Sequence, residues 1–151
     1  MISSSFHLRP WLTGLLAALL LQLAACSHSP SEEALHAALD QLQESGQNRE
    51  LDTFMDLVAD DFSGNGGEFD RDGMERLLRL IAMRHKSIGV TRTSTQIEMH
   101  GELAEVTMSL LITGGSGGML PETGQLMETR SSWRFEDGEW KVTSATWKPV
   151  G

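Results

Sequence analysis

The sequence contains one cysteine, Cys26, among 151 residues, and it contains no tyrosine. A single cysteine excludes an internal disulfide and a metal centre built from several thiolates. Basic residues are also scarce, because 12 Lys and Arg stand against 21 Asp and Glu and leave a net charge of −9. A chain of this acidity repels nucleic acid, so we expect no nucleic-acid partner.

The length and the composition are those of one folded domain. Hydrophobic residues make up 40% of the chain and charged residues 22%, which is typical of a folded protein rather than of a disordered one. A chain of 151 residues has room for a single hydrophobic core. We therefore expect a single domain that follows the N-terminal segment.

An apolar run over residues 12–25 follows a polar start whose only basic residue is Arg9. A helix of that length rises about 21 Å, which is short of the roughly 30 Å core of a bilayer. The layout is that of a secretory signal. Its last residues and the next one, Leu23-Ala24-Ala25-Cys26, resemble the lipobox of bacterial lipoproteins at all four positions.

That resemblance implies how the chain is processed and where it resides. Residues 1–25 would be a removed signal peptide, Cys26 would carry the lipid that anchors the protein to a membrane, and residues 26–28 would be a short tether. Ser27 is not the aspartate that resembles an inner-membrane retention signal, so the expected address is the outer membrane, with the domain in the periplasm. The alternative is a plain secretory signal with an accidental cysteine.

Three amphipathic segments open the mature chain. Ser29-Pro30-Ser31-Glu32 has the pattern of a capping box, which predicts a helix that begins at Pro30 and ends near Gly46. Asn48 is expected to cap a second helix that reaches Val58, and Asp70 a third that ends near residues 84–86. The apolar residues of each segment recur at helical spacing.

From residue 87 the apolar residues alternate, which predicts strands over 87–99, 103–113, 125–135 and 140–147. Asp137-Gly138 between the last two is a strong signal for a two-residue hairpin turn. A glycine-rich loop is expected over residues 114–124. Helices followed by antiparallel strands indicate an α+β domain, over residues 29–151, in which the helices pack on one face of the sheet.

The closing hairpin from Trp133 to Val142, with Trp147 near the end, resembles the nuclear transport factor 2-like (NTF2-like) superfold, which includes the SnoaL-like proteins. The resemblance implies a cone in which three helices and a curved four-stranded sheet enclose a pocket. Members include isomerases, dehydratases, hydrolases, transport factors and binding modules, so the fold alone does not choose a function. Ketosteroid isomerase-like sites need a tyrosine, and this chain has none. We therefore carry over no catalytic residue and expect no cofactor.

Strand parity predicts the lining of this pocket. A two-residue turn at Asp137-Gly138 places Trp133 on the inner face, with a band of small hydroxyls farther along each hairpin. The predicted lining residues are Thr93, Thr95, Met108, Leu110, Ser131, Trp133 and Ser144.

The opposite parity predicts the outer face of the sheet. It holds the charged strand residues, namely Arg92, Glu98, Glu105, Glu128, Arg130, Arg134 and Lys141. No strand carboxylate would then reach the pocket as a general acid or base. Leu111, Ala145 and Trp147 share this face and form a candidate homodimer contact. A strand bulge would reverse the parity beyond it.

Residues 61–72 partly imitate a calcium-binding loop, with oxygen-bearing residues at alternate positions and Gly66 at the sixth. Glu68 stands where an apolar residue is usual, and Asp72 replaces the closing glutamate. A tight polar turn accounts for the same glycines. We therefore expect no metal site.

These patterns predict an acylated envelope protein whose pocket binds a small apolar or amphipathic ligand, or an envelope partner protein, without turnover. The first alternative is an isomerase, dehydratase or hydrolase that uses a helix-borne carboxylate or His85. The second is a structural component of the envelope.

The anchor is tested by replacing its cysteine. We expect Cys26→Ser to abolish incorporation of radiolabelled palmitate in growing cells, because the thiol that forms the thioether is gone. Autoradiography of the immunoprecipitated protein measures this, with Ser27→Ala as the control that keeps the label. Continued labelling of the Cys26→Ser protein would contradict the lipoprotein interpretation.

Overall fold

The computed structural model describes residues 29–115 and 123–151. The predicted signal peptide and Cys26 with its tether lie outside the described residues, as does most of the predicted loop over residues 114–124. Among the described helices, none is both long and apolar enough to cross a membrane. The elements are, in order, α2 (Glu32–Asn48), α3 (Leu51–Asp56), β1 (Val58–Gly64), α4 (Arg71–Arg84), β2 (Ser87–His100), β3 (Leu103–Gly115), β4 (Thr123–Glu136) and β5 (Glu139–Pro149).

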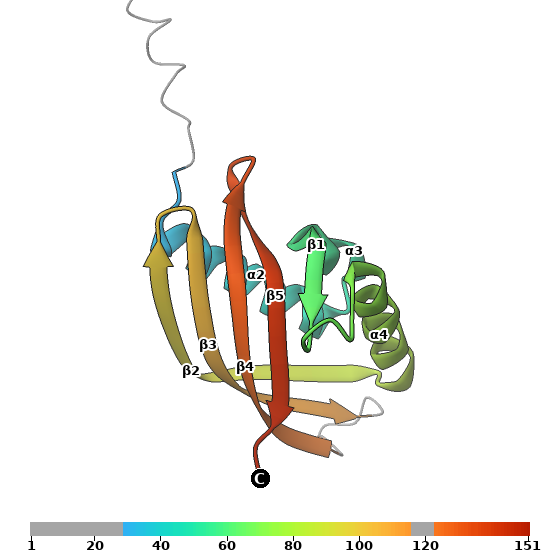
Figure 1. Ribbon diagram of the computed structural model, residues 1–151. Coiled ribbons are helices and arrows are strands. Elements are labelled where there is room, and N and C mark those ends of the chain that lie inside the picture. The colour runs from blue at the N-terminus through green and yellow to red at the C-terminus, as the bar shows by residue number, and fades with distance from the viewer. Residues whose placement is uncertain (1–28, 116–122) are drawn as a thin grey trace, which may run out of the picture.

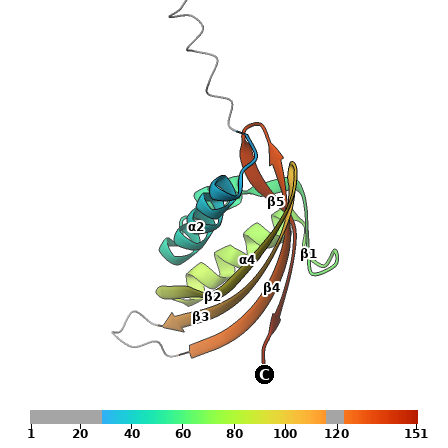
Figure 2. The ribbon, with the colours of Figure 1, turned by 90° about the vertical axis from the view of Figure 1, so that its left-hand side faces the viewer.

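The strands form one sheet in the order β1-β5-β4-β3-β2. The sheet is curved, and α2 and α4 lie on its concave side (Figures 1 and 2). Strands β2 to β5 are antiparallel to their neighbours, whereas β1 runs parallel to β5. The α+β class is confirmed, and the described residues contain helices before the long strands as predicted.

Strand β1 was not predicted. The prediction of a four-stranded sheet was therefore wrong by one strand. The sequence pattern assigned Val58 to a helix, but α3 ends at Asp56 and Val58 begins the strand. Strand β1 pairs with β5 through Val58–Val142 and Ser63–Ser144, with an irregular register between these pairs. The partner lies about eighty residues away in sequence, so no local alternation reveals the pairing.

The first helix begins two residues later than the capping box predicted. Ser31 is the N-cap, and its Oγ accepts a hydrogen bond of 3.1 Å from the Ala34 backbone N–H. The Ser31 carbonyl also accepts from the indole Nε1 of Trp140, at 3.2 Å. Trp140 is only 2% exposed, and a buried indole N–H needs an acceptor. This tertiary bond helps to fix Ser31, rather than Ser29, at the start of the helix.

The two other predicted caps have opposite outcomes. Asp70 caps α4 as predicted, because its Oδ1 accepts from the Gly73 N–H at 2.7 Å. Asn48 does not cap a helix, since α2 continues through it and past Gly46. The chain turns instead at Arg49, whose φ of 59° is left-handed. The Arg49 N–H then donates to the Gly46 carbonyl at 3.3 Å.

The Asp137-Gly138 turn is confirmed, with φ of 53° and 84°, and it pairs Trp133 with Val142. A β-bulge interrupts each of the two hairpins, β4–β5 and β2–β3. Ser132 pairs with Ser144, so Thr143 is the extra residue in β5. Arg92 pairs with Leu110 and Ser94 with Ser109. Each bulge reverses which side chains face the helices beyond it.

The hydrophobic core fills the end of the domain near the β4–β5 turn. Trp133, Trp140 and Val106 are at most 2% exposed there, and Leu35 and Leu39 of α2 pack against them in the same cluster. Burial of such side chains stabilises a fold by about 1.5–3 kcal/mol each. The other end of the sheet is less densely covered, and the candidate site lies there.

An ion pair on the outer surface joins β1 to β4 across β5. Both terminal nitrogens of Arg134 contact the carboxylate of Asp61, at 3.0 and 3.1 Å, and Nε of Arg134 contacts Glu136 at 2.7 Å. The hydrogen bond from Arg134 lowers the pKa of Asp61, and the hydrogen bond to Asp61 raises the pKa of Arg134. The pair helps to hold the edge strand β1 against the sheet.

We expect Asp61→Asn to lower the free energy of unfolding at pH 7 and to have a vanishing effect in acid. The pKa of Asp61 is lower in the folded chain than in the unfolded one, so its stabilisation is present above about pH 4 and is lost as the pH falls through the folded pKa. Urea titrations between pH 2 and 7 measure this. Asp60→Asn is the control, since Asp60 makes one contact of 3.7 Å with Arg71. A pH-independent effect of Asp61→Asn would contradict the assignment.

Candidate ligand-binding site

A cavity of about 750 Å³ lies between the helices and the concave face of the sheet. Residues from α2, α3 and α4 and from all five strands line it. Its size falls in the range of about 300–1,000 Å³ that is usual for small-molecule sites. Most of the lining is apolar, so the cavity suits a ligand with a substantial apolar part.

The inner end of the cavity is formed by buried apolar side chains. Leu39, Phe62, Trp133 and Val142 all line it and are at most 5% exposed. The indole of Trp133 donates a hydrogen bond of 2.9 Å to Ser131 Oγ, and that hydroxyl donates to the Val106 carbonyl at 3.4 Å. The Ser131 hydroxyl therefore holds the indole in place and has no hydrogen left to donate to a ligand.

Four of the seven predicted lining residues belong to the cavity: Met108, Leu110, Ser131 and Trp133. Thr93 and Ser144 do not, because both strands bulge and Ser144 follows the extra residue of β5. The hydroxyl of Thr93 donates instead to the Ser109 carbonyl, at 3.2 Å. Thr95 pairs with Met108 but lies on the edge strand β2, outside the lining.

The same bulges bring into the cavity three residues that were predicted on the outer face. Ala145 and Trp147 line the cavity, so they are not part of an outer patch. Arg92 also lines it, and its guanidinium forms an ion pair with Asp40 of α2. On the outer face, Leu111 is instead paired with Leu126, and both are 39% exposed. A homodimer contact there stays a prediction.

The ionisable groups in the described lining of this cavity are basic residues. Among the described residues, no Asp or Glu lines it, whereas Arg49, His85 and Arg92 do. Arg49 follows α2, and its Nη1 contacts the carbonyls of Ala82 and His85 at the end of α4, both at 3.5 Å. The prediction that Arg92 points outward was wrong, because Arg92 lines the cavity.

His85 sits against the backbone of β3. A Cβ atom at Gly114 would lie only 2.8 Å from the His85 Nδ1, which is closer than Cβ atoms approach other heavy atoms in folded proteins. Gly114 therefore leaves the space that the imidazole occupies. Both residues line the cavity, at the end opposite the Trp133 core.

Gln43 lines the cavity and carries a buried oxygen that is unpaired in the described structure. Its Nε2 donates to the Val90 carbonyl at 3.0 Å, while its Oε1 is buried and has no partner among the described residues. Gln47 donates to the same carbonyl, at 3.2 Å. An unpaired buried acceptor costs about 1–3 kcal/mol, so a donor from a ligand or a water would be favourable beside Gln43.

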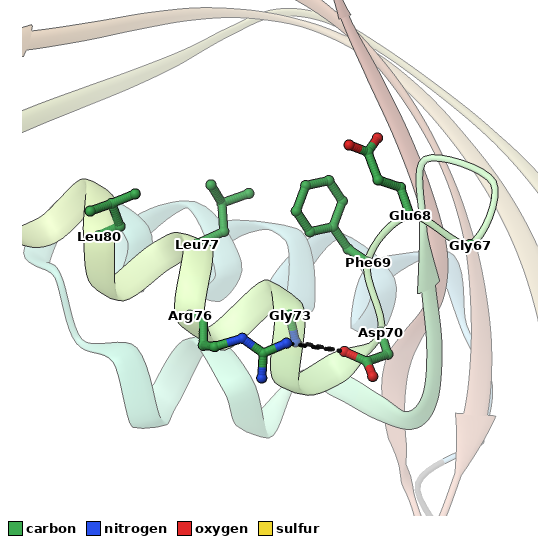
Figure 3. Close-up of a pocket in the computed structure, with 8 residues that line it drawn as sticks. All are labelled: Gly67, Glu68, Phe69, Asp70, Gly73, Arg76, Leu77 and Leu80. Atoms are coloured by element: carbon green, nitrogen blue, oxygen red, sulfur yellow. Dashed lines mark hydrogen bonds and ion pairs between the residues drawn. The ribbon is translucent and has the colours of Figure 1, made fainter.

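A second hollow, of about 490 Å³, lies at the start of α4 (Figure 3). Figure 3 shows Phe69 near Leu77, and Asp70 beside Arg76, 4.0 Å apart. The Asp70 carboxylate already caps α4. Because Asp70 is already engaged with Gly73 and Arg76, and the larger cavity is mostly apolar in its lining, we assign the site to the larger cavity.

In the calcium-like stretch over residues 61–72, Asp61 and Asn65 use their side-chain oxygens for contacts within the protein. The side-chain oxygen of Asn65 accepts from the Trp147 backbone N–H at 3.0 Å, and Asp61 binds Arg134. Asn65 has a φ of 48°, and Gly66 and Gly67 also have positive φ. In the described parts of the chain, no three His, Cys, Asp or Glu side chains cluster in a way that could hold a metal ion.

Sequence comparison identifies no relative, since no protein-family model and no curated protein matches the chain. Solved structures do match. A candidate dehydratase of the NTF2-like family from Streptomyces avermitilis is 22% identical, with a TM-score of 0.68 over 79% of this chain and 95% of that one. A candidate scytalone dehydratase from Novosphingobium aromaticivorans is 13% identical, with a TM-score of 0.70 over 90% and 89%.

Two further solved structures also match, and the chain covers a smaller share of their length. An NTF2-like protein of unknown function from Pseudomonas putida is 14% identical, with a TM-score of 0.67 over 78% of this chain and 84% of that one. Bd1075 of Bdellovibrio bacteriovorus is 11% identical, with a TM-score of 0.69, and the chain spans 41% of its length. At these identities the matches show the architecture and not the activity. The described domain therefore has the NTF2-like fold.

Proposed function

We propose that this protein is an envelope lipoprotein whose domain binds a small apolar or amphipathic ligand without chemical turnover. The observation that carries the proposal is the lining of the 750 Å³ cavity, which is mostly apolar and has no Asp or Glu among the described residues. An open apolar cavity favours ligand binding over a purely structural role, because a structural domain gains stability by filling its core.

The membrane anchor is the second part of the proposal, and it is supported by the lipobox-like quartet ending at Cys26. The first helix begins at Glu32, so the five residues between Cys26 and the helix reach about 17 Å at most when extended. A tether of that length keeps the domain near the outer membrane. The proposed address is the periplasmic side of that membrane.

An enzyme is the second candidate, and the position of His85 is the observation that favours it. The imidazole lines the cavity, and a histidine can act as a general acid or base near neutral pH. Two proteins with this fold are named as candidate dehydratases. However, no described carboxylate lies within 4.0 Å of His85 to orient it, which weakens this reading.

We expect the cavity to bind the neutral apolar fluorophore N-phenyl-1-naphthylamine, and Leu110→Trp to weaken that binding by about tenfold or more, because the larger side chain occupies the cavity. Leu110 lines the cavity, whereas its neighbour Leu111 is exposed on the other face. Leu111→Trp is therefore the matched control and should change the affinity less than about twofold. Fluorescence titration measures both, and equal effects would place the binding elsewhere.

We expect Gln43→Met to leave the ligand-free protein as stable as the parent or to stabilise it by about 0.5–1.5 kcal/mol, because the substitution removes the unpaired buried oxygen. The Val90 carbonyl keeps its bond from Gln47. Gln47→Met, which removes a hydrogen bond only, should cost about 0.5–1.5 kcal/mol. Urea unfolding measures the two. Equal losses would show that solvent already satisfies Gln43.

A further inference from the structure

We propose that the cavity selects a single-chain amphiphile with an anionic head group, and this inference rests on the proposed binding function. The apolar chain would occupy the end lined by Trp133 and Phe62, and the head group would lie beside Arg49 and His85. The shared chemistry is a carboxylate or a phosphate on one acyl or alkyl chain.

The charge of the lining opposes the charge of the whole chain. The protein has nearly twice as many acidic as basic residues, yet the ionisable groups in the described lining are Arg49, His85 and Arg92. Arg92 is paired with Asp40, so its charge is compensated. Arg49 has no carboxylate of the described residues within 4.0 Å. A cation of this kind at an apolar cavity favours an anionic ligand.

The donors of Arg49 remain available for a ligand. Only its Nη1 contacts protein atoms, at 3.5 Å from the carbonyls of Ala82 and His85, while Nε and Nη2 make no hydrogen bond in the described structure. A guanidinium presents five N–H donors in a planar fork that matches a carboxylate or a phosphate. The long contacts hold the side chain near the end of α4 without using most of its donors.

The backbone of Arg49 also suggests selection for its side chain. Its φ of 59° is in the left-handed region, where glycine is the usual residue after a helix because a Cβ atom is strained there. Glycine would therefore be the better choice for stability alone. An arginine in this place is readily explained when its guanidinium has a role at the cavity.

Two of the ionisable groups of the cavity lie toward one of its ends. Buried aromatic and aliphatic residues form the end near Trp133, whereas Arg49, His85, Gly114 and Thr123 line the end where β3 finishes and β4 begins. A ligand with a chain and a head group fits this gradient better than a wholly apolar ligand.

The test uses the full chain with Cys26→Ser, so that no acyl group of its own competes, and four probes with the same alkyl chain: dodecanoate, dodecyl phosphate, dodecanol and dodecyltrimethylammonium. We expect an anionic probe to bind at least about tenfold more tightly than dodecanol, and the cationic probe to bind most weakly. Intrinsic tryptophan fluorescence reports binding, since Trp133 and Trp147 line the cavity. Tighter binding of dodecanoate assigns a carboxylate ligand, and tighter binding of dodecyl phosphate assigns a phosphorylated lipid.

Variants then locate the effect. Arg49→Gln should reduce binding of the anionic probe to the level of dodecanol and leave dodecanol unchanged. Arg49→Gly should do the same without lowering the melting temperature, which separates a ligand role from a structural one. Arg84→Gln, an equal change of charge at an exposed residue outside the lining, should change neither.

The two levels of the proposal fail in different ways. Equal affinity for all four probes, or an equal loss in Arg84→Gln, would overturn the head-group inference while the binding function stands. Absence of binding by every probe, with N-phenyl-1-naphthylamine also unbound, would overturn the binding function itself.

Discussion

The structure depends on a mismatch in length between its two layers. Helix α2 has 17 residues and spans about 26 Å, whereas strand β2 has 14 residues and spans about 45 Å. The helices can therefore cover only part of the sheet. Near the β4–β5 turn the two layers close on Trp133 and Trp140. Beyond that core the sheet is longer than the densely packed layer of helices. It curves around the helices, and the space between the two layers is the cavity.

The bulges in β2 and β5 keep apolar side chains on the inner face of the sheet along the length of these strands. Without them the alternation set at the Asp137-Gly138 turn would place Ser144 and Thr146 inside, and Ala145 and Trp147 in water. The extra residue Thr143 reverses this, so that the indole of Trp147 lines the cavity and packs 5.6 Å from the ring of Phe69. A long strand can thus present apolar side chains to the same interior along its whole length, although its simple alternation would not allow it.

The sequence was sufficient for the helical segments, the two antiparallel hairpins, the Asp70 cap and the inner position of Trp133, because each depends on a local signal. It was not sufficient for β1, whose pairing is parallel and distant, or for the start of α2, which involves the indole of Trp140. The bulges did leave a signal. Apolar residues fall on even positions at Val142 and on odd positions at Trp147, and the same switch separates Val90 from Ile97. Reading that change of parity as a bulge would have moved Arg92 and Trp147 into the site and Thr93 and Ser144 out of it.

The bond from Trp140 to the Ser31 carbonyl has a mechanical consequence. It fastens the first turn of the domain to the closing hairpin, at the end where the layers are tightly packed. The chain then runs along α2 (Figure 2) to Arg49, whose guanidinium contacts the His85 carbonyl. Tension applied to the residues before Ser31 would therefore load the tightly packed end of the domain, whereas Arg49 and His85 lie toward the other end of α2. The end of the domain that such a load would reach first is thus separated from these groups by the length of one helix.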